Sequence, residues 1–213
     1  MGVSSSLRSI SIPVWITLGI VVVCSIAMRV HSLDRSFWQD EVWVVNAVVA
    51  PTFSQMVYYE GWLNTSPPLF LLLVRWTTQL FGVTHASMRL VPVLFGILSV
   101  PAMAYLALRL LQPWYALVAV ALFSLSQDHI ILTQSVKQYS TDAFVSLIFL
   151  TLGYHFLITR SRKNFYFAII AFSICGFLSY QIIMFLPIFF YAVCFDFHNT
   201  KSSQNRFTIP SVG

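Results

Sequence analysis

The chain is organised as long uncharged stretches separated by short groups of charged residues. Four such stretches cover residues 9–28, 90–108, 110–127 and 143–159, and each is 17 to 20 residues long. A helix needs about 20 apolar residues to cross the hydrocarbon core of a bilayer. The pattern therefore predicts transmembrane helices at these four positions.

A fifth uncharged stretch, residues 164–195, is too long for a single crossing. Its 32 residues would form a helix of about 48 Å, against a hydrocarbon core of roughly 30 Å. We therefore expect two short spans that turn near residues 176–181, which brings the total to about six. Arg8 ahead of the first stretch also allows a secretory signal peptide, but the later spans favour a membrane anchor.

Two shorter apolar stretches, residues 42–50 and 67–81, are ambiguous. The second opens on Pro67-Pro68 and stops at Gly82, which are start and stop signals of a helix. If it crossed the membrane, the basic residues near position 160 would lie opposite the N-terminus, against the positive-inside rule. We therefore predict two interfacial helices within a long first outer loop, at about residues 31–88.

This arrangement separates the charges of the chain. Six of the seven acidic residues fall on the outer side and only Asp196 lies with the inner basic set. The inner basic residues are Arg8, Arg109, Arg160, Arg162, Lys163, Lys201 and Arg206. The outer acids are Asp34, Asp40, Glu41, Glu60, Asp128 and Asp142. The inner loops thus explain the net charge of +5, and no nucleic-acid partner is needed.

Composition supports the same fold class. Only 9% of the 213 residues are charged, against roughly 25% in soluble domains, and 58% are hydrophobic. Mean hydropathy is +0.78. These values exclude a soluble globular domain, a disordered chain and a disulfide-stapled module. We predict an all-α, polytopic membrane helix bundle over residues 1–199, followed by a polar tail over 200–213.

The outer acids are the first candidates for chemistry. Asp40 and Glu41 are adjacent and flanked by aromatic residues at the predicted membrane surface. Asp40 could instead cap a helix that starts at Glu41, although Trp43 gives no capping box. Two adjacent acids exceed what a cap requires, so we favour a functional role, with which a cap is compatible.

A second outer segment, residues 126–142, places many hydrogen-bonding groups between two apolar helices. Taken singly, Lys137 could be an interfacial residue and Asp142 an acid in the first turn of a helix. The density of hydrogen-bonding groups in this segment is harder to explain in that way. Ionisable residues at this depth are functional candidates by default.

The order of these features resembles the GT-C superfamily of integral-membrane glycosyltransferases. The shared pattern is a first span, the acidic pair Asp40-Glu41, a Pro-Pro-Leu helix at 67–69, an Arg-Leu-x-Pro segment from Arg89, and the motif Lys137-Gln138-Tyr139. The resemblance covers about residues 10–197. It is strongest to bacterial members of the O-mannosyltransferase and aminoarabinose-transferase type.

The resemblance implies transfer of a sugar from a polyprenyl-phosphate carrier to a lipid, glycan or protein acceptor on the outer or periplasmic face. It also implies a multi-pass protein of the bacterial inner (plasma) membrane. By that resemblance Asp40 is the catalytic acid, acting as general base, and Glu41 its neighbour. Substrate-binding roles fall to five residues: Lys137, Tyr139, Asp142, Arg75 and Arg89. In one branch the second acidic position helps to hold a divalent metal, which makes Asp40 and Asp142 metal candidates.

The chain departs from the family pattern at two points. Thr65-Ser66 stand where many relatives place a His or Lys, so phosphate contact would depend more on Lys137 and the arginines. The chain also has about half the usual length, as expected for a fragment, a truncated product or one half of an assembly. Two other functions stay open. These are a non-catalytic scaffold, or a transporter, although the spans show no repeat and few midplane charges.

Overall fold

The computed structural model describes residues 11–58, 66–159, 162–185 and 187, and within these ranges the secondary structure is entirely helical. The all-α class is therefore confirmed. The helices in chain order are α1 (Ile12–Val30), α2 (Gln39–Val49), α3 (Phe53–Val57), α4 (Pro68–Phe81), α5 (His85–Leu110), α6 (Pro113–Leu125), α7 (Gln127–Thr133), α8 (Tyr139–Thr159), α9 (Arg162–Gly176) and the 3-10 helix η1 (Tyr180–Phe185).

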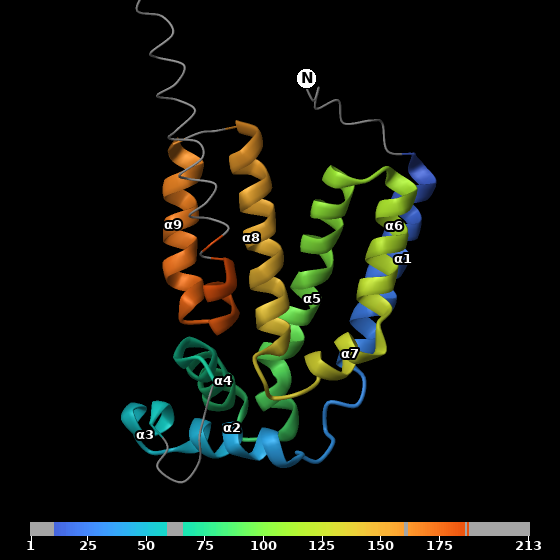
Figure 1. Ribbon diagram of the computed structural model, residues 1–213. Helices are drawn as coiled ribbons and strands as arrows, with labels where there is room; N and C mark the ends of the chain where they lie inside the picture. The colour runs from blue at the N-terminus through green and yellow to red at the C-terminus, as the bar shows by residue number, and fades with distance from the viewer. Residues whose placement is uncertain (1–10, 59–65, 160–161, 186, 188–213) are drawn as a thin grey trace, which may run out of the picture.

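Five helices, α1, α5, α6, α8 and α9, run along a common direction and form the bundle (Figure 1). Within the described residues, α1 and α5 are each long and apolar enough to cross a membrane. The pair α6–α7 would be a third such helix, bent by 52° at its break. Helices α8 and α9 occupy the positions of the predicted fourth and fifth spans. The predicted sixth span lies largely outside the described residues.

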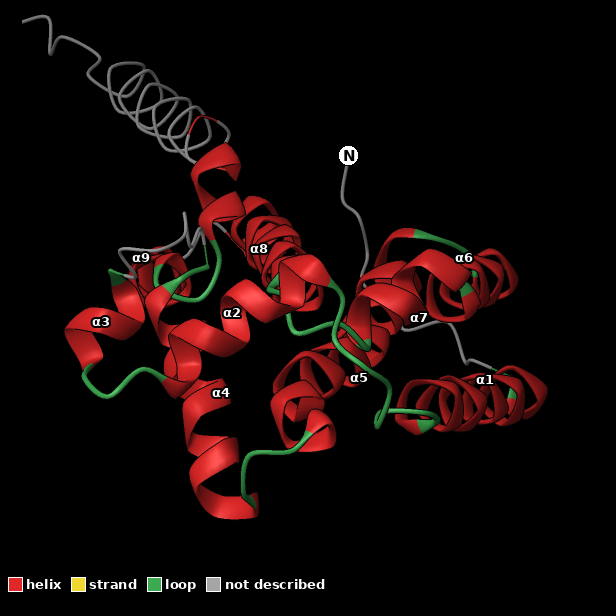
Figure 2. Cartoon of the chain, turned by 90° about the horizontal axis from the view of Figure 1, so that it is seen from below, coloured by secondary structure: helices red, strands yellow, loops and turns green. Residues whose placement is uncertain are grey.

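Helices α2 and α4 lie across one end of the bundle. In the view along the bundle direction, α1, α5 and α8 are seen end-on while α2 and α4 are seen lengthwise (Figure 2). Residues 67–81 therefore form a helix that lies across the bundle, as the interfacial interpretation requires, and its place at a membrane interface stays a prediction. Pro67 and Pro68 begin α4, and Gly82 ends it with a φ of 80°, a conformation that glycine adopts without strain. We call this end of the bundle, which carries α2, α3, α4 and α7, the outer end, because the charge distribution of the sequence predicts that it faces outward.

The long uncharged stretch turns where its length requires. Helix α9 ends at Gly176, and the chain reverses into η1 by Tyr180. This matches the predicted turn near residues 176–181.

Two clusters of buried side chains hold the bundle together. The larger cluster joins the interfacial helices to α5 and α8 and is built around Met56, Phe70, Leu71, Met88 and Val136. The smaller cluster joins α1, α5 and α6 and consists of small side chains: Val21, Val100, Ala104, Ala107, Ala116 and Val120. Small residues let the backbones of membrane helices approach closely, which compensates for the weak hydrophobic drive between helices in lipid.

Helices α5 and α7 approach each other closely where Gly96 of α5 lies against Thr133 at the end of α7. A Cβ atom at Gly96 would lie 2.6 Å from Thr133 Cβ, which is far inside van der Waals contact. Thr133 is fully buried, and its hydroxyl donates to the Ile130 carbonyl at 2.7 Å, so the side chain has no room to move away. Glycine at position 96 is therefore required for α7 to pack on α5.

We expect Gly96→Ala to destabilise the protein by about 1–3 kcal/mol, the usual cost of overpacking, although alanine is the better helix former. Thermal unfolding of the detergent-solubilised protein measures the change. Gly153→Ala in α8 is the matched control, because nothing lies within 4 Å of a Cβ there. Equal midpoints for the two variants would contradict the close contact.

Candidate functional site

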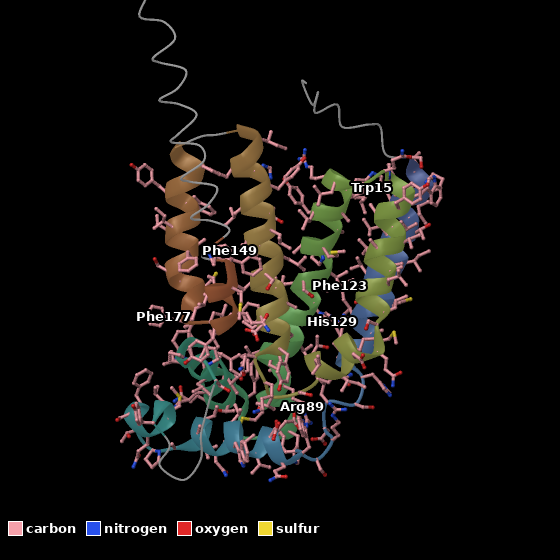
Figure 3. All side chains as sticks on the ribbon, viewed as in Figure 1. Trp15, Arg89, Phe123, His129, Phe149 and Phe177 are labelled. Carbon is pink, nitrogen blue, oxygen red and sulfur yellow. The ribbon has the colours of Figure 1, made fainter. Side chains whose placement is uncertain are left out.

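A buried ion pair joins α2 to α5 at the outer end. Glu41 and Arg89 both have side chains that are 0% exposed, and Arg89 Nη2 lies 2.9 Å from Glu41 Oε2. Arg89 Nε and Nη2 also donate to Oε1 of the same carboxylate, each at 3.2 Å. Figure 3 shows Arg89 at the base of the bundle. Burying two charges costs several kcal/mol per ion unless the remaining hydrogen-bonding capacity is filled.

The surrounding backbone fills that capacity. The guanidinium donates to three carbonyls of the loop before α2, those of Leu33, Arg35 and Ser36, at 2.7, 2.6 and 3.3 Å. The carboxylate accepts from the backbone N–H of Val136 at 2.7 Å and from that of Trp38 at 3.2 Å. The pair thus fixes the outer loop, α2, α5 and the segment after α7 relative to one another.

The position of Asp40 corrects the capping interpretation. Helix α2 starts at Gln39 with Trp38 as its N-cap residue, so Asp40 is the second residue of the helix and does not cap it. Glu41 instead accepts from the N-cap backbone, as in one half of a capping box. Asp40 is half-buried, and its carboxylate forms no hydrogen bond or ion pair with any residue of the described part of the chain.

Lys137 lies beside these acids. Its side chain is buried, in the segment between α7 and α8, and burial lowers the pKa of its ammonium group. The negative charges of Asp40 and Glu41 oppose this by raising the pKa. Lys137 forms no ion pair with either acid, although their charges act on it. The Asp40 carboxylate is therefore near enough for its charge to act on the Lys137 amine. Neither side chain forms a hydrogen bond or an ion pair with another of the described residues.

Asp142 follows in the first turn of α8, ahead of the apolar stretch 143–159. Its Oδ1 atom accepts a 2.5 Å hydrogen bond from Ser179, in the turn after α9. Burial raises the pKa of Asp142 to about 6, and the Ser179 hydrogen bond opposes the rise. Within the described residues, no group of three or more His, Cys, Asp or Glu side chains is placed to hold a metal. The metal roles of Asp40 and Asp142 thus stay predictions.

The other predicted site residues lie apart from the Asp40 carboxylate or are engaged elsewhere. Arg75 of α4 donates to the Pro51 carbonyl at 3.3 Å, beyond the C-terminal end of α2, whereas Asp40 lies at its N-terminal end. Arg89 is committed to Glu41 and the loop carbonyls. Tyr139 is the first residue of α8 and is exposed.

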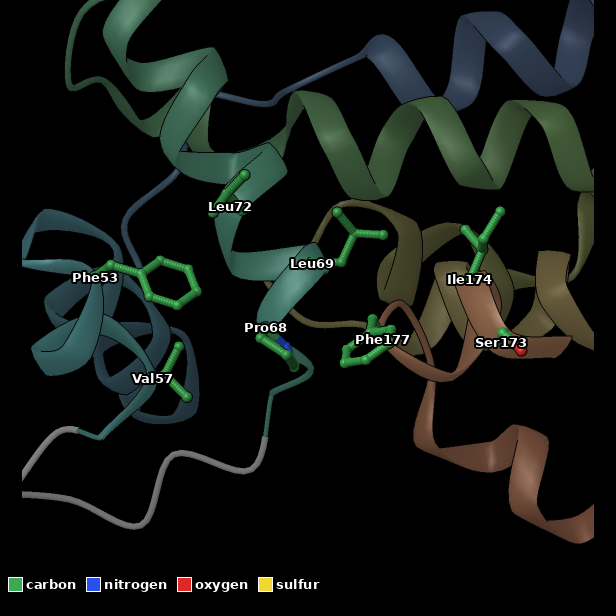
Figure 4. A pocket seen from close by; sticks show the side chains of 8 residues that line it. All are labelled: Phe53, Val57, Pro68, Leu69, Leu72, Ser173, Ile174 and Phe177. Carbon is green, nitrogen blue, oxygen red and sulfur yellow. The ribbon is translucent and has the colours of Figure 1, made fainter. Parts of the chain in front are cut away.

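An apolar pocket of about 610 Å³ lies between α3, α4 and α9 (Figure 4). Its lining is hydrocarbon except for Ser173: Phe53, Val57, Pro68, Leu69, Leu72, Ile174 and Phe177. A second pocket of about 510 Å³ shares Pro68, Ser173 and Phe177 and extends the space to Tyr180. The two pockets offer an apolar chain a continuous surface.

Short contacts connect this pocket to the segment that carries Lys137. Ser66, just before Pro68, donates from its hydroxyl to Gln138 Oε1 at 3.2 Å. Ser179, the partner of Asp142, lies two residues after Phe177 of the pocket wall. The outer end therefore carries a cation and a carboxylate without a partner, and the Ser66–Gln138 hydrogen bond connects the segment of the cation to an apolar pocket at the other end of α2. This combination suits an anionic amphiphile with a long hydrocarbon chain.

No sequence pattern predicted the partners of several residues that organise this region. Ser179, Ser66 and Gln134 are common polar residues in turns or short segments, and nothing in the pattern paired them with distant partners. Arg29 marked only the end of the first span. The one signal in the sequence was its position in the last turn of an apolar helix, because an arginine at such a site needs hydrogen-bond partners.

Comparison with known proteins supports a membrane enzyme. The family model described as dolichyl-phosphate-mannose-protein mannosyltransferase matches residues 65–209. This is more than half of the chain, and it confirms the resemblance to membrane glycosyltransferases. The matched segment includes Lys137, Tyr139 and Asp142 but begins after Asp40 and Glu41. No curated protein and no solved structure was found to match the chain.

We expect Arg89→Met to cost about 3–5 kcal/mol of stability, because it leaves the Glu41 carboxylate buried without a counter-charge. The midpoint of thermal unfolding in detergent should fall by several degrees. Arg75→Met is the control, since it removes a half-exposed arginine with a single long hydrogen bond. A midpoint for Arg89→Met equal to that of the control would show that the buried pair is not a structural element.

Proposed function

We propose that this chain, which belongs to the dolichyl-phosphate-mannose-protein mannosyltransferase family, transfers a sugar from a polyprenyl-phosphate carrier to an acceptor hydroxyl at the outer end of the bundle. The acceptor is a lipid, a glycan or a protein. The membrane is the inner (plasma) membrane of a bacterium, and the outer end faces the periplasm.

The observation that carries the proposal is the different environment of two adjacent acids. The carboxylate oxygens of Glu41 accept hydrogen bonds from Arg89 and from two backbone N–H groups. The Asp40 carboxylate, in contrast, has no hydrogen-bond partner in the described residues. An acceptor hydroxyl must lose a proton as it attacks the anomeric carbon, and a positioned carboxylate can accept that proton. Asp40 is the acid available for this step, acting as general base.

Lys137 provides the matching charge for the donor. When the bond from the anomeric carbon to the phosphate oxygen breaks, negative charge develops on the phosphate and must be stabilised. The Lys137 ammonium lies on the same side of the bundle as Asp40 and has no ion-pair partner among the described residues. The adjoining apolar pocket takes the hydrocarbon chain of the carrier, so one molecule fills both parts of the site.

Removing the carboxylate charge tests the assignment of the base. We expect Asp40→Asn to lower the rate of transfer by roughly 10²- to 10⁴-fold, the usual contribution of a general base, with an unchanged unfolding midpoint. The assay follows transfer of radiolabelled sugar from a panel of polyprenyl-phosphate sugars, using the chain in proteoliposomes.

Asp128→Asn is the matched control for this experiment, because Asp128 is an exposed acid on α7 at the same end of the bundle. It should retain the rate of the unmodified protein. Transfer by Asp40→Asn at that same rate would rule out Asp40 as the base.

The pH dependence of donor binding tests Lys137. Binding of the anionic phosphate needs the protonated amine, so affinity should fall as pH rises through the pKa of Lys137. Asp40 raises that pKa, and its removal in Asp40→Asn should therefore move the loss of binding to lower pH. Equilibrium binding of polyprenyl phosphate, measured from neutral pH upward, gives both curves. Lys137→Met should lack the pH step, and a step that persists in this variant would refute the assignment.

A further inference from the structure

Gln134 closes the outer end of α1. Its side-chain amide Nε2 donates to the carbonyls of Met28 at 2.8 Å and His31 at 2.9 Å, with a longer contact of 3.4 Å to that of Arg29. The last four carbonyls of a helix have no partner within the helix, and leaving them unsatisfied next to an apolar bundle is costly. Gln134 is itself buried, so a residue of the segment after α7 completes the hydrogen bonding of α1.

Arg29 of α1 contacts the two helices on either side of the α6–α7 bend. Its Nη1 atom donates to the Ser124 carbonyl in the last turn of α6 at 2.9 Å, and to the hydroxyl and carbonyl of Ser25. Its Nη2 atom contacts His129 Nδ1 of α7 at 2.6 Å. Figure 3 labels His129 together with Phe123, which stand on either side of the 52° bend between α6 and α7.

This arginine is fully buried and forms no ion pair in the described ranges of the chain. Its charge is met by carbonyl and hydroxyl dipoles, including the negative end of α6. Two sets of hydrogen bonds therefore connect α1 to this region. Arg29 of α1 binds both sides of the α6–α7 bend, and Gln134 of the segment after α7 binds the end of α1.

These hydrogen bonds fix the backbone that carries Lys137. The Gln134 carbonyl accepts from Arg35 at 3.2 Å, and two residues later the Val136 N–H donates to Glu41. The segment is thus tied to α1 on one side and to the Glu41–Arg89 pair on the other. Lys137 is the next residue, and its buried side chain starts from this clamped backbone.

We propose that Gln134 is a positioning residue for the phosphate of the donor, acting through Lys137 by holding this segment against the end of α1. The inference rests on the proposed function, because it assumes that Lys137 contacts the phosphate. The side-chain amide of Gln134 donates to the carbonyls at the end of α1, so in this proposal it does not contact the donor itself.

A double-mutant cycle separates positioning from a general structural effect. The measurement is equilibrium binding of polyprenyl phosphate to the detergent-solubilised chain, with the unfolding midpoint recorded for every variant. Lys137→Met should weaken binding by about tenfold or more, the value of a charge-assisted hydrogen bond. Gln134→Met, which keeps the length but loses the donors, should weaken it to a comparable degree. The double variant should bind no more weakly than Lys137→Met alone.

Ser135→Ala is the matched control, since it removes a neighbouring side-chain hydrogen bond, to the Ile131 carbonyl, without touching α1. It should leave the affinity unchanged. If Gln134→Met does not fold, Gln134→Asn replaces it in the cycle, because the shorter amide stays polar but cannot reach the carbonyls of α1.

Each outcome decides the question. The positioning role would be overturned if the double variant lost affinity by the product of the two single losses. It would also be overturned if Ser135→Ala lost as much affinity as Gln134→Met. No loss in Gln134→Met or Gln134→Asn would do the same. No loss in Lys137→Met would reject the phosphate contact in the proposed function, and with it the inference. A transfer assay that fails while the cycle shows non-additivity would leave the positioning role supported and the proposed reaction rejected.

Discussion

The buried pair of Glu41 and Arg89 is the constraint on which the outer end depends. A fully buried carboxylate and guanidinium are tolerated only when nearly all of their hydrogen-bonding capacity is used. Here three loop carbonyls and two backbone N–H groups use it, and these come from two distant parts of the chain, residues 33–38 and Val136. The need to satisfy two charges therefore dictates where the outer loop, α2 and the segment before α8 lie.

This constraint divides the work between two neighbouring acids. Consecutive residues at a helix start point in different directions, so Glu41 faces α5 while Asp40 does not join the pair. One carboxylate is used to hold the structure together, and the other has no partner in the described residues. The proposed role of Asp40 as general base needs both a fixed position and a free oxygen, and the pair is compatible with both.

The outer end also explains why the proposed donor is an amphiphile. Ser66 and Ser179 tie the polar segment around Lys137 to the elements that line the apolar pocket. Because α2 and α4 lie across the end of the bundle, their apolar faces pack against that end (Figure 2). The same geometry that closes the core therefore connects the Lys137 segment to a hydrocarbon-lined pocket at the same end of the bundle.

The sequence by itself determined the all-α class, the flat course of α4, the turn after Gly176 and the concentration of acids at one end. Those features follow from local rules: span length, charge asymmetry, and proline and glycine signals. The tertiary structure decided which residues are partners. Arg89 was expected at the phosphate and is bound to Glu41, Arg75 lies at the far end of α2, and Gln134 closes a helix more than a hundred residues away. Such pairings depend on satisfying buried polar groups across the whole bundle, and no local pattern encodes that requirement.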